Sequence, residues 1–249
     1  MAIMQKLIFR ILFAVCIFQS EHLIGQRVLL HEEPDTTGEI PSYGRNRSVY
    51  AHQLMKLGVI PAICENGAQT NFWSTSISYE LRTKAKICSW NAAILDFGYR
   101  CDRFVINQNQ NKLLPGYFGN HKRERLSTHN LSFSLCDRFN FGRRGNILGI
   151  YTDIGFYGDF VFRATHLYVD EFYDSNSPIT GHTKTVVKNN RLEYINRMNF
   201  GLTARVGWEW GSFYAMYRIN DLVLDHPPLT EYPDLPKLVI GIEMYGVTD

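Results

Sequence analysis

One stretch in the second half of the sequence alternates strictly between apolar and polar side chains, and it constrains the fold more than any other feature. The apolar positions are Met198, Phe200, Leu202, Ala204, Val206, Trp208 and Trp210. The positions between them are Asn199, Gly201, Thr203, Arg205, Gly207 and Glu209. Successive side chains of a β-strand point to opposite faces, so the stretch predicts a strand with one apolar and one polar face. Which face points inward decides between a soluble protein and a membrane protein.

The same alternation recurs along the chain, with no helical pattern between its segments. The segments are His52–Ala62, Asn71–Lys84, Ile87–Ile106, Glu124–Phe141, Ile147–Phe172, Lys188–Glu209, Ser212–Asn220 and Pro236–Val247. Short connections, such as Gly142–Asn146, alternate with long loops such as Asn107–Arg123 and Tyr173–Asn190. Membrane barrels have short turns at one end and long loops at the other. The pattern predicts an all-β fold, a closed antiparallel up-and-down transmembrane β-barrel of about 8 strands.

The N-terminus has the composition of an export signal. Lys6 and Arg10 flank or interrupt an apolar stretch from Leu7 to Phe18, and polar residues follow it. This stretch is shorter than the roughly 20 apolar residues that a membrane-spanning helix needs. We expect a cleaved signal peptide over residues 1–25, a polar lead-in over 26–49 and the barrel over 50–249. The cysteines beyond the signal, whose pairing stays open, are Cys64, Cys88, Cys101 and Cys136.

The size of the apolar side chains indicates which face meets the interior. An eight-stranded ring encloses only enough room for packed side chains or one small ligand. The apolar faces carry too many aromatic rings for that space, so we expect them to contact lipid. The polar faces then point into the lumen, where buried charges must pair. The predicted lumen charge network is Glu80, Arg82, Asp96, Arg100, Asp153, Arg205, Arg218 and Glu243. The aromatics expected at the membrane interfaces are Trp73, Trp90, Phe139, Trp208 and Trp210.

The closing pattern resembles that of a known group of proteins. Tyr217-Arg-Ile-Asn-Asp-Leu222, a proline-containing loop and Lys237-Leu-Val-Ile-Gly-Ile-Glu-Met-Tyr245 are similar to the last two strands of small outer-membrane β-barrel proteins of Gram-negative bacteria, of the outer-membrane-protein-A-barrel and PorT-like kind. The resemblance covers roughly Tyr50 to Val247. It implies a monomer in the outer-membrane lipid, with a structural, adhesive or secretion-accessory role. Its outer loops would contact an extracellular or secretion-machinery protein.

Other classes of function have little support in the sequence. The formal net charge of +2 and the lack of a basic stripe argue against a nucleic-acid partner. No metal-ligand spacing or nucleotide-binding motif occurs, so we expect no cofactor, no metal and no enzymatic activity. Ser127 and His129 have the two-residue spacing of a lipid hydrolase pair, in reverse order. Two alternatives stay open: a soluble exported β-barrel that binds a hydrophobic ligand, and an outer-membrane lipid hydrolase.

Overall fold

The computed structural model describes most of the chain beyond its first 46 residues. The described residues are 47–62, 70–71, 73–108, 121–141, 143–144, 147–172, 183–190, 192–224 and 234–246. They all belong to one compact unit, residues 42–249. The predicted signal peptide, most of the polar lead-in and Cys64 lie outside the described residues. No helix within the described ranges is both long and apolar enough to cross a membrane.

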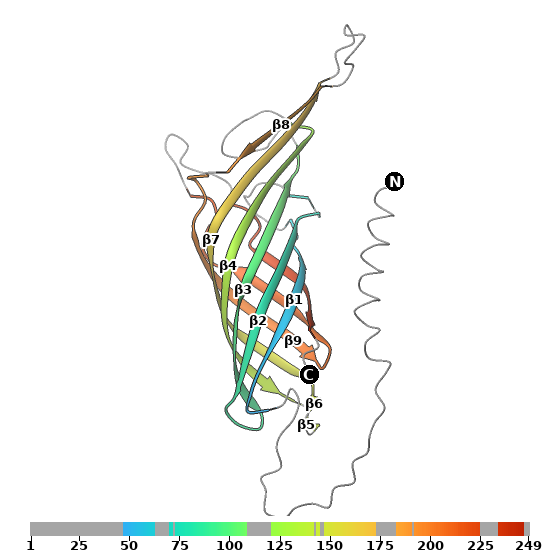
Figure 1. The fold of residues 1–249 in the computed structure, drawn as a ribbon, viewed down its shortest axis with the longest axis vertical. Coiled ribbons are helices and arrows are strands. Elements are labelled where there is room, and N and C mark those ends of the chain that lie inside the picture. The colour runs from blue at the N-terminus through green and yellow to red at the C-terminus, as the bar shows by residue number, and fades with distance from the viewer. Residues whose placement is uncertain are drawn as a thin grey trace, which may run out of the picture. The chain divides into compact units, whose positions relative to one another are not determined.

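Nine strands of the described part form one antiparallel sheet, and two more form a small separate hairpin (Figure 1). The strands of the sheet are β1 (Val49–Val59), β2 (Thr75–Lys86), β3 (Asn91–Ile106), β4 (Arg123–Asn140), β7 (Tyr151–Phe172), β8 (Thr183–Asn189), β9 (Met198–Trp208), β10 (Gly211–Arg218) and β11 (Leu238–Tyr245). The hairpin consists of β5 (Arg143–Arg144) and β6 (Ile147–Leu148).

Eight of these strands close into a ring through their backbone hydrogen bonds. Neighbours pair in the order β1, β2, β3, β4, β7, β9, β10 and β11, and β11 pairs back onto β1. In this closing pair, Leu57 lies opposite Ile242. β8 pairs with the far part of β7 and lies outside the ring. The prediction of an all-β, antiparallel up-and-down arrangement is confirmed, with a ninth strand added to the expected eight or so.

The prediction of one strand over Lys188–Glu209, preceded by a loop over Tyr173–Asn190, is wrong. The structure divides this region into β8 and β9, which residues 190–197 connect. The reason is the length of β7, which has 22 residues and extends past the ring. The free edge of β7 gives the β-branched residues of β8 a strand to pair with. Val186 of β8, for example, lies opposite Val169 of β7.

The two ends of the ring differ in their connections. At one end, which we name the turn end, β2 and β3 are joined by residues 87–90 and β9 and β10 by residues 209–210. β1 begins and β11 ends at this same end. At the other end, the loop end, longer connections such as residues 107–122 and 219–237 join the strands. β8 also lies at the loop end, at the top of Figure 1.

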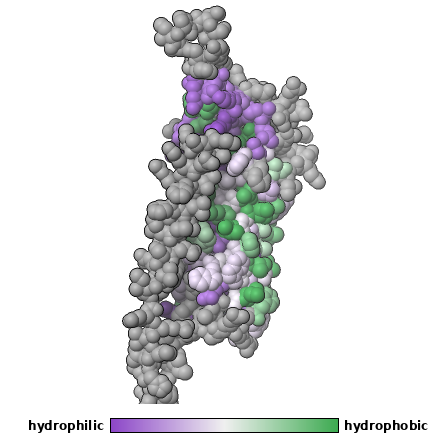
Figure 2. All heavy atoms as spheres, turned by 90° about the vertical axis from the view of Figure 1, so that its right-hand side faces the viewer, coloured by the Kyte–Doolittle hydropathy of each residue, from purple (hydrophilic) through white to green (hydrophobic). Residues whose placement is uncertain are grey.

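Burial alternates along the strands of the ring in the sense opposite to that of a soluble protein. In β9, the polar positions such as Arg205 are buried and the apolar positions such as Phe200 are exposed. The same holds in β7, where Asp153 is buried and Phe156 is 67% exposed. Polar side chains therefore occupy much of the interior of the ring, and apolar side chains cover its outer wall. On the face drawn in Figure 2, hydrophobic residues lie below a hydrophilic region at the loop end.

Several inward-facing glycines make room for this interior. A Cβ at Gly207 would overlap the ring of Tyr151, and one at Gly241 would lie 2.8 Å from the ring of Tyr214. At Gly98, a Cβ would overlap the carbonyl oxygen of Tyr79 on the neighbouring strand. A larger residue at Gly98 would therefore push β2 and β3 apart.

We expect Gly98→Ala to lower the free energy of unfolding by about 1–3 kcal/mol, the usual effect of overpacking. The matched control is Gly158→Ala in β7, where the added Cβ would lie 3.9 Å from its nearest neighbour, the carbonyl oxygen of Asn199. Chemical denaturation of the two purified variants measures the difference. Equal stability of the two variants would show that β2 and β3 have room to separate.

Candidate functional site

Four charged side chains from four strands meet in the interior of the ring. Arg82 of β2 binds Asp96 of β3 through two hydrogen bonds, Nε to Oδ1 at 2.7 Å and Nη2 to Oδ2 at 2.9 Å. Arg205 of β9 lies 2.6 Å from Asp96 and 3.1 Å from Glu243 of β11. Arg82 also donates to Glu243 at 3.1 Å. Each arginine thus contacts both carboxylates, and the four side chains are almost completely buried. We name them the central ion cluster.

Two further ion pairs extend this cluster across the interior. Lys56 of β1 donates to Glu80 at 2.5 Å and lies 3.6 Å from Glu243. Arg138 of β4 binds Asp153 of β7 through two hydrogen bonds of 2.7 and 2.8 Å. With these pairs the set comprises four cations and four anions, so its formal charges cancel.

Neutral groups complete the hydrogen bonding of the carboxylates. Ser134 donates to Asp96 at 3.1 Å, and Ser212 donates to Glu243 at 2.6 Å. The guanidinium of Arg138 stacks over the ring of Tyr151, with 3.6 Å between its central carbon and the ring centroid. A buried charge is tolerated when it is paired and hydrogen-bonded. These neighbours therefore help to hold the ionised groups in the interior.

A second charged cluster lies nearer to the loop end. Arg100 of β3 donates to Asp102 at 3.1 Å and to Asp159 of β7. Asp102 also accepts hydrogen bonds from Ser76 at 2.5 Å and from Asn130 at 3.0 Å. The guanidinium of Arg100 therefore ties β3 to β7 across the interior.

A large part of the loop end of the interior is apolar, although buried polar pairs such as Glu124 with His166 also lie there. A cluster of buried side chains fills the apolar part, formed by Ile60, Phe104, Ile106, Leu126, Tyr157, Val161, Ala164, Ile195, Tyr214, Met216, Leu222, Val223, Leu235 and Val239. Two of the loop connections contribute to this cluster and pair through a β-bridge between Ile195 and Val223. Parts of the connections before β9 and after β10 thus pack against the inner side of the wall, on the loop-end side of the charged clusters.

All eight predicted lumen residues are buried inside the ring, but they do not form one network. Six of them belong to the central ion cluster or to the two ion pairs beside it, and Arg100 forms the second cluster. Arg218 lies apart at the loop end, where it donates to Asp234 at 2.9 Å and to the carbonyl oxygen of Leu235 at 2.8 Å. It therefore fixes the connection between β10 and β11.

Sequence reasoning missed several charged residues of the interior. Lys56, Asp102, Arg138 and Asp159 are buried and form the ion pairs described above. Three of them continue the alternation of faces that had already been assigned: Asp102 follows Arg100, and Arg138 and Asp159 lie on the polar faces of their segments. Lys56 lies in the segment with the weakest alternation. Extending each polar face to the end of its strand would have found Asp102, Arg138 and Asp159.

The predicted interface aromatics lie at the two ends of the ring. Trp73 is exposed near the loop end, whereas Trp90, Trp208 and Trp210 are exposed near the turn end. Phe139 is half-buried and stacks on Trp90 with 6.1 Å between the ring centroids.

The side chains considered for catalysis do not assemble into a reactive site. Ser127 and His129 are half-buried, and no hydrogen bond joins them in the described structure. The Nδ1 atom of His129 instead lies 2.5 Å from the hydroxyl of Tyr99. The part of the chain that the structure describes contains no group of three or more His, Cys, Asp or Glu residues that could hold a metal ion. Among the described cysteines, Cys88, Cys101 and Cys136 are free thiols.

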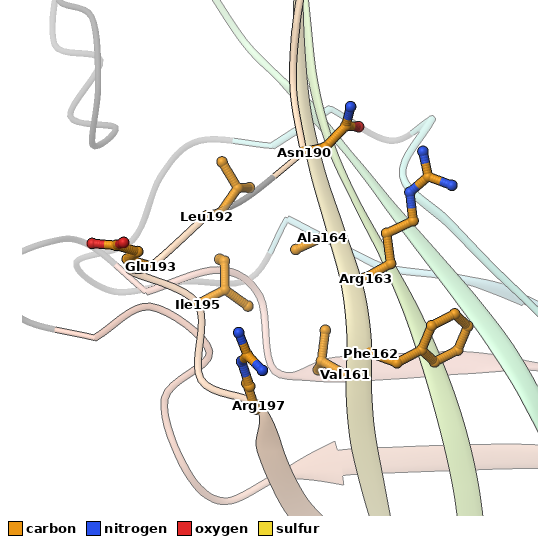
Figure 3. A pocket seen from close by; sticks show the side chains of 9 residues that line it. All are labelled: Val161, Phe162, Arg163, Ala164, Asn190, Leu192, Glu193, Ile195 and Arg197. Atoms are coloured by element: carbon orange, nitrogen blue, oxygen red, sulfur yellow. The ribbon is translucent and has the colours of Figure 1, made fainter.

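One pocket of about 260 Å³ lies where β7 leaves β9 and before it meets β8 (Figure 3). Its lining residues are Val161, Phe162, Arg163, Ala164, Asn190, Leu192, Glu193, Ile195 and Arg197. β7 pairs with β9 as far as Phe160 and with β8 from His166. The pocket therefore occupies an interruption in the hydrogen-bonded wall, beside the apolar cluster.

At the loop end an exposed ion pair joins the chain before and after one long connection. Asp221, just beyond β10, accepts a hydrogen bond from Lys237, just before β11. This hydrogen bond lowers the pKa of Asp221 and raises the pKa of Lys237, because it favours the charged form of both side chains. Both groups are thus held charged at neutral pH.

Comparison with known proteins adds no family assignment. No known protein-family model matches the sequence, and no curated protein matches it either. The functional argument therefore depends on the geometry of the ring.

We expect Arg205→Leu to lower the free energy of unfolding by about 3–5 kcal/mol, because Asp96 and Glu243 would lose a buried partner. The control is Arg197→Leu, which removes an exposed arginine just before β9 and should change stability by no more than about 0.5 kcal/mol. Denaturation midpoints of the two variants test this. Similar midpoints would mean that the central ion cluster contributes no more than a surface charge.

Proposed function

We propose that this protein is an integral outer-membrane β-barrel whose lumen is plugged by ion pairs, with a structural, adhesive or secretion-accessory role. The observation that carries the proposal is the inverted distribution of side chains. Fully buried arginines such as Arg82 lie inside the ring, while rings such as that of Phe156 stand on its outside. Only an apolar surrounding makes this distribution favourable.

The outer wall supports a lipid environment. Phe156, Phe200, Phe213 and Ile242 are all exposed, by 42–67%, on four successive neighbours in the ring, β7, β9, β10 and β11. Soluble monomers rarely expose a continuous apolar patch larger than a few hundred Å², roughly, because burying such a surface is worth about 25 cal/mol per Å². In a membrane, acyl chains would contact this wall, and the free-energy cost of exposing apolar surface to water would not arise. The exposed aromatics near each end are typical of the two interfaces of a membrane barrel.

The interior supports a plug and not a pore. Eight strands leave room for packed side chains but not for a wide channel. The central ion cluster pairs its charges across the ring, and the apolar cluster with its inward-folded connections fills the loop end. An ion would have to break several buried ion pairs to pass.

The two alternative functions fit this arrangement less well. A soluble carrier of hydrophobic ligands needs an apolar lumen, whereas buried ion pairs from several strands occupy this interior. A lipid hydrolase would need Ser127 hydrogen-bonded to His129 or to another base, and His129 contacts Tyr99 instead. The long connections at the loop end are the parts of the barrel that could contact a protein partner.

We expect the full-length protein to fractionate with the outer membrane of a Gram-negative host and to resist extraction by alkaline carbonate. A folded barrel resists unfolding by detergent, so the unboiled sample should migrate differently from the boiled sample on a gel. The destabilised variant Gly98→Ala should lose its folded band at a lower temperature than the wild-type protein, because its added Cβ strains the pairing of β2 with β3. Recovery of the folded protein in the soluble periplasm would contradict the proposal.

We expect the purified protein to form no discrete open-channel steps in a planar lipid bilayer, because the paired charges and the apolar cluster occupy the lumen. Detergent without protein serves as the blank. Regular conductance steps from the wild-type protein would show that the lumen is open, and would replace the plugged barrel by a channel.

A further inference from the structure

Basic side chains gather on the outer wall at the loop end. Arg103 of β3, Arg163 of β7 and Lys188 of β8 are exposed, and Arg125 of β4 is half-buried. We name these four residues the cationic rim. Arg103, Arg125 and Arg163 lie on the outward faces of β3, β4 and β7, whose inward faces carry the second charged cluster and the apolar cluster. Lys188 lies on β8, which pairs with β7.

The strand register brings the members of the rim close together. Arg125 lies opposite Leu167, which lies opposite Lys188, so the two cations stand at the same height on the wall. Arg103 lies opposite Ser127, two residues along β4 from Arg125. Diagonal neighbours of this kind are about 7–8 Å apart in an antiparallel sheet. The positive charges are therefore crowded on one part of the wall.

A β-bulge adds Arg163 to the rim. The register between β4 and β7 shifts just after His129, and the consecutive residues Phe162 and Arg163 are both exposed. Strict alternation would have turned one of them inward, and re-aiming a side chain is a common effect of bulges. Arg163 lies opposite His129, which is two residues along β4 from Ser127, the partner of Arg103, so Arg163 and Arg103 belong to the same part of the wall.

Within the part of the chain that the structure describes, no carboxylate pairs with the rim. None of its four residues forms an ion pair with any other described residue. Two acids near the far end of β7 are already engaged, because Asp170 pairs with His121 and Glu171 pairs with Lys122. Like charges that face one another across a sheet are destabilising. An anion from outside the chain would relieve this repulsion.

Apolar side chains lie directly below the rim on the same strands. Tyr99, Leu131 and Phe160 stand side by side at one height and are exposed. Phe162 follows next, adjacent to Arg163. Cations above exposed rings match the headgroup and acyl-chain regions of a lipid layer. A free anion would neutralise the rim but would leave these rings uncovered.

We propose that the cationic rim binds the phosphate groups of anionic lipids, whose acyl chains pack on the rings below it. This inference rests on the proposed membrane location and adds a preferred lipid at the loop end. The four cations, the bulge that turns Arg163 outward and the adjoining apolar wall all favour a lipid over a soluble anionic partner.

Native mass spectrometry of the full-length protein in a neutral detergent tests the proposal. Phosphatidylglycerol and phosphatidylcholine with the same acyl chains are titrated separately, and bound lipids are counted. We expect phosphatidylglycerol to bind more tightly. The double variant Arg103→Gln/Arg163→Gln should weaken its binding by about fivefold for each cation removed, since a basic residue near an anionic lipid surface contributes about 1 kcal/mol.

The matched control is Arg47→Gln/Lys86→Gln, which removes two cations at the turn end and should leave this preference unchanged. Equal binding of the two lipids, an equal loss in the control variant, or inorganic phosphate binding as tightly as the lipid would each overturn the inference. Insertion of the same preparation into phosphatidylcholine vesicles is measured in parallel. Insertion without preference for phosphatidylglycerol defeats only this inference, whereas failure to insert defeats the proposed function as well.

Discussion

The pairing of buried arginines with buried carboxylates is the interaction on which the rest of the structure depends. Arg82 and Arg205 each contact both Asp96 and Glu243, and these residues come from β2, β9, β3 and β11. The cluster therefore joins strands on both sides of the closing pair between β1 and β11. Without such pairs, an interior of this polarity would be unstable, because an unpaired ion in a region of low dielectric costs several kcal/mol, roughly.

The ring and its interior depend on each other. Backbone hydrogen bonds close the sheet and place the inward side chains opposite one another, while inward glycines such as Gly207 leave space for the rings of Tyr151 and its neighbours. The central ion cluster lies nearer the turn end than the second charged cluster, and the inward-folded connections add apolar contacts at the loop end. In the proposed membrane barrel, this division gives a plugged lumen, a lipid-facing wall and one elaborated end.

Much of the fold and of the candidate site follows from the alternation of side chains. The faces of Met198–Trp208 and of the neighbouring segments were correctly assigned, because a period of two is a direct consequence of strand geometry. β8 was missed because its pairing depends on how far β7 extends, which no local pattern records. The outward position of Arg163 was also hidden, since a bulge breaks the very period on which the reading relied.

The sequence by itself determined most of the secondary structure, the approximate number of strands in the ring and, outside the bulge, which side chains share a face, since these depend on local spacing. Only the tertiary structure decided which charges meet. Asp96 and Glu243 are far apart in the chain, and their common contacts with Arg82 and Arg205 follow from ring closure and strand register. The same closure separated Arg218 from the central ion cluster and brought the cations of the outer wall together. Long-range register, which sets these distances, is a property of the whole sheet and not of any one segment.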